Sequence, residues 1–318
     1  MKIVFVTTPD PRKQGDLLEV SMLHGLRTVL GKDCIDLPRK KVMYHDWSDT
    51  TKKELHGNGF TLYKNPIQDL SEDERRNLSN VDAVIYGVTN AYGVEEDPSI
   101  NQITGGKNIW FLDGHDLYGE APKLIDFEGE TVIGVQKTPC FKRELIERID
   151  GAYPTGFGIP KYQIRPENSR NRTQLYQKTA PDAALFKEVN DLGGSRAHHV
   201  FTNEDEYYED LCSSWFGLTC KKGGWDCLRH YEIIAAGALL LFRDYNDKPP
   251  MCSPQVLPCL SYSSREELDD MMHSLVVNNE PTDQYLFLLE QQRHWLLNVG
   301  TTEARAKHLL KILENETA

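Results

Sequence analysis

The sequence predicts an α/β fold made of two domains, each built around a parallel sheet. Two segments carry this prediction. Residues 2–37 have the pattern strand, helix, strand, and residues 213–242 repeat that order around a glycine-rich loop. A strand–helix–strand unit of this kind is typical of parallel strands. The length of 318 residues exceeds what one typical core holds and fits two domains.

The first half of the chain supplies the elements of the N-terminal domain. Residues 2–8 form an apolar run typical of a buried strand, and leucine and methionine recur at helical spacing over residues 17–30. Further strands are expected at residues 34–37, 60–63, 81–88, 108–112 and 131–135, and further helices at residues 70–78 and 141–149. The segment from Pro154 to Arg172, in which glycine and proline are frequent, is expected to link the two domains.

The second half of the chain predicts another α/β unit. Helices are expected at residues 183–189, 204–211, 264–276, 283–297 and 301–313, and strands at residues 197–201 and 257–262. Ser264 precedes one of these helices as an N-cap, and Glu267 stands at the position that completes a capping box.

Residues 213–242 form the stretch on which the functional argument depends. It contains a strand at residues 216–219, a basic glycine loop at 221–224, a helix at 227–236 and an apolar strand at 239–242. Asp226 is placed as the N-cap of the helix and Gly237 as the residue that ends it. A glycine loop that opens a helix points unpaired N–H groups and the positive end of the helix dipole at one place, which favours phosphate binding.

Composition limits the classes of partner and the compartment. The net charge of −12 argues against a general binder of nucleic acid or anionic membranes. The seven cysteines are scattered, which fits reduced thiols in the cytoplasm better than a disulfide framework. The opening apolar run is too short for a signal peptide, and no stretch is long enough to span a bilayer. The histidines and cysteines match no zinc spacing, so we expect no metal.

The helix at residues 227–236 carries two charged residues that allow two interpretations. Arg229 and Glu232 are three positions apart, the spacing of an ordinary ion pair on a helix surface. Alternatively, Glu232 lies one or two turns beyond the phosphate site, where a nucleotide ribose would lie and where a carboxylate would accept a hydrogen bond from each hydroxyl of the diol. In the same way, Lys221, Lys222 and Arg229 either neutralise a diphosphate or belong to a solvated basic loop.

A second candidate site follows a strand of the N-terminal domain, where ligands of open α/β sheets bind. His115 lies between Asp113 and Asp116, so it is a candidate acid or base that either carboxylate orients. The alternative is a turn whose aspartates cap the backbone. Gly15 lies in the loop after the first strand, and this loop is a candidate phosphate or acceptor site.

The residues from Lys222 to Ala238 have the pattern K-x-G-W-D-C-x-R-H-Y-E-I-x-A-x-G-A. This pattern resembles the C-terminal donor-binding motif of GT-B glycosyltransferases, most of all their group-1 and CgeB-like branch. Four further segments are similar to members of that group, so the resemblance covers most of the chain: residues 1–6, 23–27, 57–63 and 141–145.

The resemblance implies two Rossmann-like domains facing a cleft, with no required metal or other cofactor. Residues 1–155 would form the acceptor-side domain and residues 156–295 the domain that binds a nucleotide diphosphate sugar. Residues 296–318 would form a C-terminal helix that packs back on the first domain. Glu232 is assigned to the ribose, and the turn of Gly223, Gly224, Trp225 and Asp226 to the diphosphate or the sugar.

The sequence departs from the motif at one position. Many retaining members carry two glutamates eight positions apart, and the position eight before Glu232 is Gly224. Asp226 either replaces the missing carboxylate or does not.

The function expected from the resemblance is transfer of a sugar from a nucleotide diphosphate sugar to a hydroxyl acceptor, with retention of configuration. Lys222, Arg229 and the helix N-terminus would stabilise the leaving diphosphate. The acceptor stays open among a saccharide, a lipid-linked glycan, a protein and a modified nucleic acid, and nucleic acid is less favoured because the chain is acidic. Two alternatives stay open: a nucleotide-sugar 2-epimerase of the same fold, and a non-catalytic protein that binds nucleotide sugars or glycans.

Overall fold

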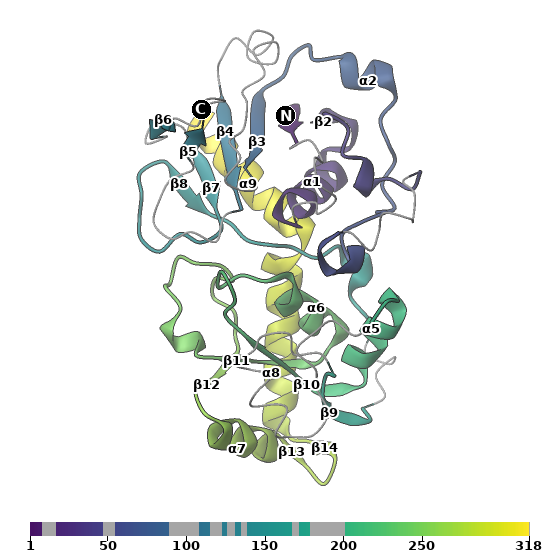
Figure 1. Ribbon diagram of the computed structural model, residues 1–318, viewed down its shortest axis with the longest axis vertical. Coiled ribbons are helices and arrows are strands. Elements are labelled where there is room, and N and C mark those ends of the chain that lie inside the picture. The colour runs from purple at the N-terminus through teal and green to yellow at the C-terminus, as the bar shows by residue number, and fades with distance from the viewer. Residues whose placement is uncertain are drawn as a thin grey trace.

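The computed structural model describes residues 1–7, 17–46, 55–88, 108–114, 123–125, 131–134, 139–166, 172–178 and 201–317. Within these ranges the chain forms two α/β halves, one above the other in Figure 1. The expected helix at residues 183–189 and most of the expected strand at 197–201 lie outside the described residues.

The N-terminal half is built on a six-stranded parallel sheet. Its strands follow the order β2 (Cys34–Leu37), β1 (Ile3–Val6), β3 (Ala83–Val88), β4 (Ile109–Asp113), β7 (Cys140–Lys142) and β8 (Ala152–Pro154). A separate antiparallel pair is formed by β5 (Lys123–Ile125) and β6 (Thr131–Gly134). The helices of this half are α1 (Leu17–Leu30) and the short α2 (Glu72–Arg76).

The C-terminal half is built on a four-stranded parallel sheet. Its strands follow the order β12 (Leu260–Tyr262), β11 (Leu239–Arg243), β10 (Ser214–Cys220) and β9 (Gln174–Tyr176). Its helices are α5 (Glu204–Cys212), α6 (Leu228–Ala236), α7 (Arg265–Leu275) and α8 (Asp283–Trp295). A two-stranded hairpin of β13 (Val276–Val277) and β14 (Glu280–Pro281) separates α7 from α8.

The largest hydrophobic core runs through both halves. Ile3 and Phe5 of β1 face this core, whereas Val4 and Val6 face a smaller cluster on the other side of the sheet, as the alternation of a strand requires. The same core contains Tyr231 of α6, and other residues of both α6 and β11. The two halves therefore meet across packed apolar side chains.

The last helix joins the two halves. After α8 a five-residue π turn, Leu296–Gly300, leads into α9 (Thr302–Thr317). In Figure 1 this helix, drawn in yellow, runs upward from the C-terminal half, and the chain ends beside the N-terminal sheet. It packs along α1. The hydroxyl of Thr302 lies 2.8 Å from Nδ1 of His24, in the middle of α1.

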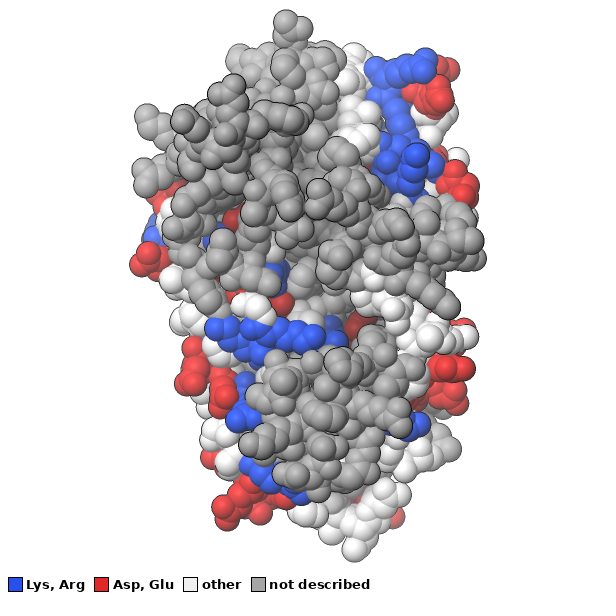
Figure 2. Space-filling view, in the orientation of Figure 1, with Lys and Arg blue, Asp and Glu red and all other residues white. Residues whose placement is uncertain are grey.

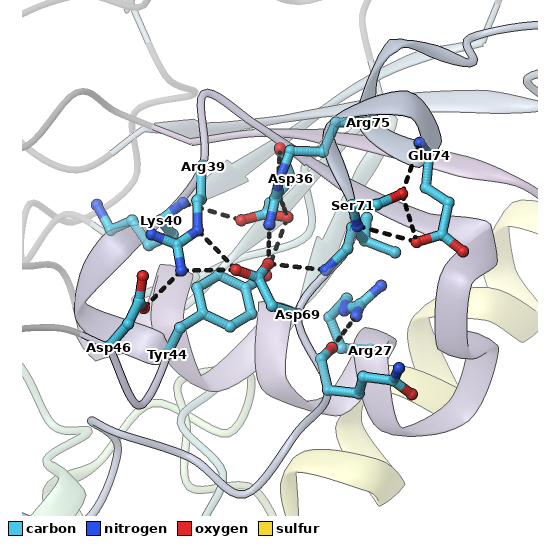
Figure 3. Close-up of polar contacts among 12 residues, drawn as sticks. Arg27, Asp36, Arg39, Lys40, Tyr44, Asp46, Asp69, Ser71, Glu74 and Arg75 are labelled. Carbon is cyan, nitrogen blue, oxygen red and sulfur yellow. Dashed lines mark hydrogen bonds and ion pairs between the residues drawn. The ribbon is translucent and has the colours of Figure 1, made fainter.

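A network of hydrogen bonds and ion pairs around Tyr44 holds the segment between β2 and β3 against β2 (Figure 3). Arg75 donates to the backbone carbonyl of Asp36 at 2.9 Å and pairs with the carboxylates of Asp36 and Asp69. Arg39 pairs with Asp69 at 2.6 Å. The guanidinium carbons of Arg39 and Arg75 lie 4.8 and 5.4 Å from the Tyr44 ring centre. This network anchors a long connection that goes on to contact the C-terminal half.

Two expected elements of the N-terminal half are wrong. Residues 141–149 were expected to form a helix, but Cys140–Lys142 are β7 and pair with β4. Residues 60–63 were expected to form a strand, but they make bends with no ladder partner in the described chain, and Thr61 has a φ of 72°. In both places the tertiary partners override a weak local pattern.

No helix in the described ranges is both long and apolar enough to cross a membrane. The described residues also hold no group of three or more histidine, cysteine, aspartate or glutamate side chains arranged for a metal ion.

Candidate functional site

Helix α6 and the turn before it lie at the junction of the two halves. The predicted strand–loop–helix–strand order is confirmed, since β10 and β11 pair in parallel on either side of α6. Gly237 ends the helix with a φ of 80°, the left-handed conformation that glycine adopts without strain. The predicted role of Asp226 as N-cap is wrong, because the cap residue is Cys227 and its side chain makes no capping hydrogen bond.

Asp226 is buried and holds together segments from three parts of the chain. Its Oδ2 accepts the backbone N–H of Phe157 at 2.8 Å, and its Oδ1 accepts the hydroxyl of Tyr231 at 2.9 Å. Arg305 of α9 donates to the carbonyl of Phe157 and to the Tyr231 oxygen, both at 3.1 Å. Burial raises the pKa of the Asp226 carboxyl, although Arg143 and Arg305 oppose the shift. In this geometry Asp226 secures the connection between the domains.

Glu232 is 7% exposed and accepts one hydroxyl hydrogen bond on each carboxylate oxygen. Thr61 of the N-terminal half donates to Oε1 at 2.5 Å, and Tyr207 of α5 donates to Oε2 at 2.6 Å. The single Thr61 hydrogen is used in this bond, so Tyr208 donates in turn to the Thr61 oxygen at 3.0 Å. Burial raises the pKa of the Glu232 carboxyl, and the two hydroxyl donors oppose the shift.

Thr61 is held in an unusual backbone conformation to make this contact. A β-branched residue at a φ of 72° is a genuine outlier. Its backbone N–H donates to Oε1 of Glu204 at 2.7 Å, and Gln163 donates to the same oxygen at 2.9 Å. Strain of this kind costs about 1–3 kcal/mol and persists where the surrounding contacts enforce it. The surroundings of Glu232 therefore include a strained residue from the opposite domain.

His230 fixes the backbone of the turn from inside α6. Its Nε2 donates to the carbonyl of Trp225 at 3.1 Å, because a carbonyl can only accept, and its Nδ1 then accepts the hydroxyl of Thr219 at 3.0 Å. Burial lowers the pKa of His230 from 6.5 to about 3, so the ring is neutral at physiological pH. Trp225 is also buried and packs against Phe242 of β11.

Acidification is expected to destabilise the protein through His230. Between pH 6.5 and about pH 3 the unfolded state binds a proton at this residue that the folded state does not, so stability falls as pH is lowered. From pH 6.5 to about pH 4 the loss is about 3 kcal/mol, at about 1.4 kcal/mol per pH unit. Denaturant unfolding measures the free energy of unfolding at each pH. Between pH 6.5 and about pH 4, that free energy should fall by about 3 kcal/mol less in His230→Gln than in wild type. The exposed His294→Gln is the matched control, and equal slopes in His230→Gln and wild type would contradict the prediction.

The basic residues in and beside the turn differ in their exposure to solvent. Lys222 is exposed, and its backbone N–H bonds the carbonyl of Gly224 at 3.1 Å. The Lys221 ammonium lies 5.2 Å from the Trp225 ring centre. Arg229 is half-buried near Glu232 and Tyr207, and these neighbours help to raise its pKa against the opposing effect of burial. Figure 2 shows lysine and arginine atoms gathered at the level where the two halves meet.

The candidate acid–base site after β4 is only partly described. Asp113 is buried, and its carboxylate pairs with the buried ammonium of Lys142 at 2.7 Å. His115, Asp116 and the loop residue Gly15 lie outside the described residues, so their assignment stays a prediction.

Two N-terminal residues that sequence reasoning did not single out contact the turn before α6. Arg143 donates to the carbonyl of Asp226 at 2.7 Å, and Glu144 accepts the backbone N–H of Asp226 at 3.0 Å. Thr61, which contacts Glu232 on α6 itself, is a third residue that sequence reasoning did not single out. The signal was present, because all three lie in the segments 57–63 and 141–145 that resemble glycosyltransferases. What the sequence lacked was any indication that these segments meet α6.

Comparisons with known proteins identify the fold. No family model matches the sequence, and no curated protein matches it either. Solved structures do match over nearly the whole chain. AviGT4, a glycosyltransferase involved in avilamycin A biosynthesis, is 13% identical with a TM-score of 0.54, and covers 99% of this chain and 98% of its own. An α-glucosyltransferase solved with UDP and a 13-mer DNA containing an A:G mismatch is 10% identical with a TM-score of 0.53, and covers 99% of both chains.

A third similar structure has a different description. The N-terminal domain of Candida albicans trehalose-6-phosphate phosphatase is 9% identical with a TM-score of 0.51, and covers 98% of this chain and 96% of its own. At these identities the likeness shows the fold alone. The fold is the GT-B arrangement of two Rossmann-like domains, as the sequence predicted. The function rests on the site.

Proposed function

We propose that the protein is a glycosyltransferase that moves a sugar from a nucleotide diphosphate sugar to a hydroxyl acceptor. The observation that carries the proposal is the hydrogen bonding of Glu232. Its carboxylate accepts one hydroxyl on each oxygen, from Thr61 and from Tyr207, at a junction between the two Rossmann-like domains. Two hydroxyls bound side by side to one carboxylate is the chemistry needed to hold the diol of a ribose. In the proposal, that diol replaces at least the Thr61 hydroxyl when the donor binds.

The turn before α6 supports binding of a diphosphate next to this carboxylate. The side chain of the N-cap residue Cys227 makes no capping hydrogen bond, and a helix N-terminus without a side-chain cap favours an anion. Lys222 stands exposed on the turn. We assign the leaving diphosphate to this place, where an ammonium and backbone N–H groups would stabilise its developing charge. Positive charge from the protein itself makes a metal-independent mechanism the simplest version of the proposal.

Lys222→Ala is expected to lower the turnover number about tenfold or more, because removing one donor to a developing anion costs roughly a hundredfold in well-ordered sites and less at an exposed one. The Michaelis constant for the donor should change less than the turnover number. Lys161→Ala is the control, since this exposed lysine pairs with Glu303 away from the turn. An unchanged turnover number would remove Lys222 from the mechanism.

The proposal is tested by incubating the protein with a panel of nucleotide sugars and measuring free nucleoside diphosphate. Slow release without an acceptor, accelerated by adding candidate saccharides, is the expected result. Isomerised sugar with its diphosphate retained would favour the epimerase instead. Binding of a nucleotide sugar without either reaction would favour a binding protein. No binding to any donor in the panel would reject the proposal.

We also propose the finer features that the GT-B resemblance implies: retention of configuration, a relationship to the CgeB-like branch and action in the cytoplasm. All seven cysteines are free thiols, which is consistent with a reducing compartment. For the acceptor we favour a saccharide over nucleic acid because the net charge is −12. The anomeric configuration of the product, measured by NMR, tests retention.

A further inference from the structure

We propose that Glu144, a residue of the N-terminal domain, recognises a hydroxyl group of the transferred sugar at the turn before α6. The inference rests on the proposed function and adds a specificity residue to it. It is carried by the unequal bonding of the two Glu144 oxygens and by the position of its carboxylate against Gly224.

One oxygen of Glu144 is occupied and the other is not. Oε1 accepts the backbone N–H of Asp226 at 3.0 Å and lies 3.2 Å from Nη1 of Arg143. Oε2 has no hydrogen-bond partner among the residues that the structure describes, although Glu144 is fully buried. The nearby thiol of Cys252 donates to the carbonyl of Leu145 at 3.4 Å, and it also lies close enough to the Glu144 carboxylate for that carboxylate to raise the pKa of the thiol. Burial raises the pKa of the Glu144 carboxyl, and Arg143 and the backbone N–H groups of Asp226 and Trp225 oppose the shift. A buried carboxylate oxygen without a donor is costly, so it calls for a ligand.

The carboxylate takes the place of a side chain at position 224. A Cβ built on Gly224 would lie 2.3 Å from Oε1 of Glu144 and 2.7 Å from its carboxyl carbon. The backbone of Gly224 does not have the positive φ that would demand glycine. The space taken by Glu144 is therefore what excludes a larger residue. This is the position, eight residues before Glu232, where the sequence lacks the first carboxylate of its motif. Glu144 brings a carboxylate to that place from the other domain.

The chemistry of the unpaired oxygen selects the ligand. A carboxylate repels the diphosphate but accepts a hydrogen bond from a hydroxyl, and a sugar supplies hydroxyls next to its phosphate. The cations beside Glu144 already have other acceptors: Arg143 donates to the Asp226 carbonyl at 2.7 Å, and Lys248 donates to the Cys252 carbonyl at 2.6 Å. Glu144 belongs to the opposite domain and already contacts the turn before α6 through the Asp226 N–H, so a sugar held at this turn would meet its carboxylate at the junction of the two domains.

The test measures two dissociation constants, for UDP-glucose and for UDP, in a matched set of variants. Glu144→Ala should weaken UDP-glucose binding tenfold or more and change UDP binding less than twofold. Gly224→Glu alone should lose UDP-glucose binding, because its side chain collides with Glu144. The double variant Glu144→Ala with Gly224→Glu returns a carboxylate to the same place, and it should bind UDP-glucose at least fivefold more tightly than Glu144→Ala.

Other outcomes would overturn the inference. Equal weakening of UDP and UDP-glucose in Glu144→Ala would make Glu144 a contact between the domains only. Tighter UDP binding would show that it competes with the diphosphate. If Glu144→Ala does not fold, the two dissociation constants are measured in Glu144→Gln instead, and the same comparison between UDP-glucose and UDP tests the inference. If wild-type protein binds no nucleotide sugar, the proposed function fails and this inference fails with it. Donor binding that depends on Glu232 but not on Glu144 overturns the inference alone.

Discussion

Replacing Glu232 by glutamine is expected to weaken binding of the nucleotide sugar by about ten- to hundredfold while the protein stays folded. A hydrogen bond to a charged group contributes about 1.5–3 kcal/mol, and about 1.4 kcal/mol is a factor of ten in affinity. Glutamine has the same shape but carries an NH2 donor in place of the second oxygen, so it cannot offer a separate acceptor oxygen to each hydroxyl of a diol. Isothermal titration calorimetry with the donor found in the panel measures the effect.

The folded state should tolerate this change better than a truncation to alanine. Burial raises the pKa of Glu232, so its charge opposes folding at neutral pH, and a neutral residue of the same shape removes that cost. The amide oxygen still accepts the hydroxyl of Thr61 or of Tyr207. Thermal melting of the variant should therefore give a transition close to that of wild type.

The matched control is Glu204→Gln. Glu204 is a carboxylate at the same junction, and its Oε1 accepts two N–H donors, from the Thr61 backbone at 2.7 Å and from the Gln163 amide at 2.9 Å. Its substitution should change donor affinity less than threefold. Equal loss in both variants would mean that Glu232 acts by holding the domains together, and wild-type affinity in Glu232→Gln would reject the ribose assignment.

The bonds of Glu232 also bear on how a donor reaches it. The Thr61 hydroxyl occupies Oε1, so the conformation described here is one in which the N-terminal domain covers the carboxylate. In the proposed ribose assignment the diol needs that oxygen, so donor binding would require a conformation in which Thr61 has moved away. The affinity measured for a donor is reduced by the fraction of protein in the covered state. The strained backbone of Thr61 makes its withdrawal less costly.

The sequence predicts the elements whose signals are local. The unit from β10 to β11 follows from an apolar strand, a glycine loop, a helical pattern and a glycine at the helix end, all within thirty residues. Prediction from the sequence fails where a short segment obtains its structure from partners that are distant in the chain. Residues 141–149 have a helical composition, yet Phe111 of β4 pairs with Cys140 and draws the start of this segment into the sheet.

Only the part of the candidate site that comes from the C-terminal half of the chain could be predicted from the sequence. Glu232 and the turn before α6 are neighbours in sequence, so spacing placed them together. Thr61 lies 171 positions before Glu232, and Glu144 lies 82 positions before Asp226. Neither contact has a local pattern, because each depends on how two domains dock. A glycine where the motif has a glutamate was visible in the sequence, but only the structure shows which side chain fills the space.

Gly25→Ala is expected to destabilise the protein by about 1–3 kcal/mol, although alanine is the better helix former. In an isolated helix the exchange would gain about 1 kcal/mol. In the protein, a Cβ at position 25 would lie 2.0 Å from the backbone carbonyl oxygen of Thr302 and 3.0 Å from the Cβ of Ala306. A backbone atom cannot relieve the clash by changing rotamer as a side chain can, so α9 must shift away from α1. Overpacking of this kind costs about 1–3 kcal/mol and occasionally more, which outweighs the gain in propensity.

The displacement should also be visible at the junction of the domains. The backbone of Ile159 bonds to Gly300 and to Thr302 at 3.0 Å each, so moving the start of α9 disturbs the connection that Asp226 secures. We expect a lower melting temperature, faster proteolysis at the start of α9 and reduced donor turnover. Thr28→Ala, one turn further along α1, should stay within about 0.5 kcal/mol of wild type. A Gly25→Ala protein more stable than wild type would show that helix propensity dominates, and that α9 does not sit against α1 at this point.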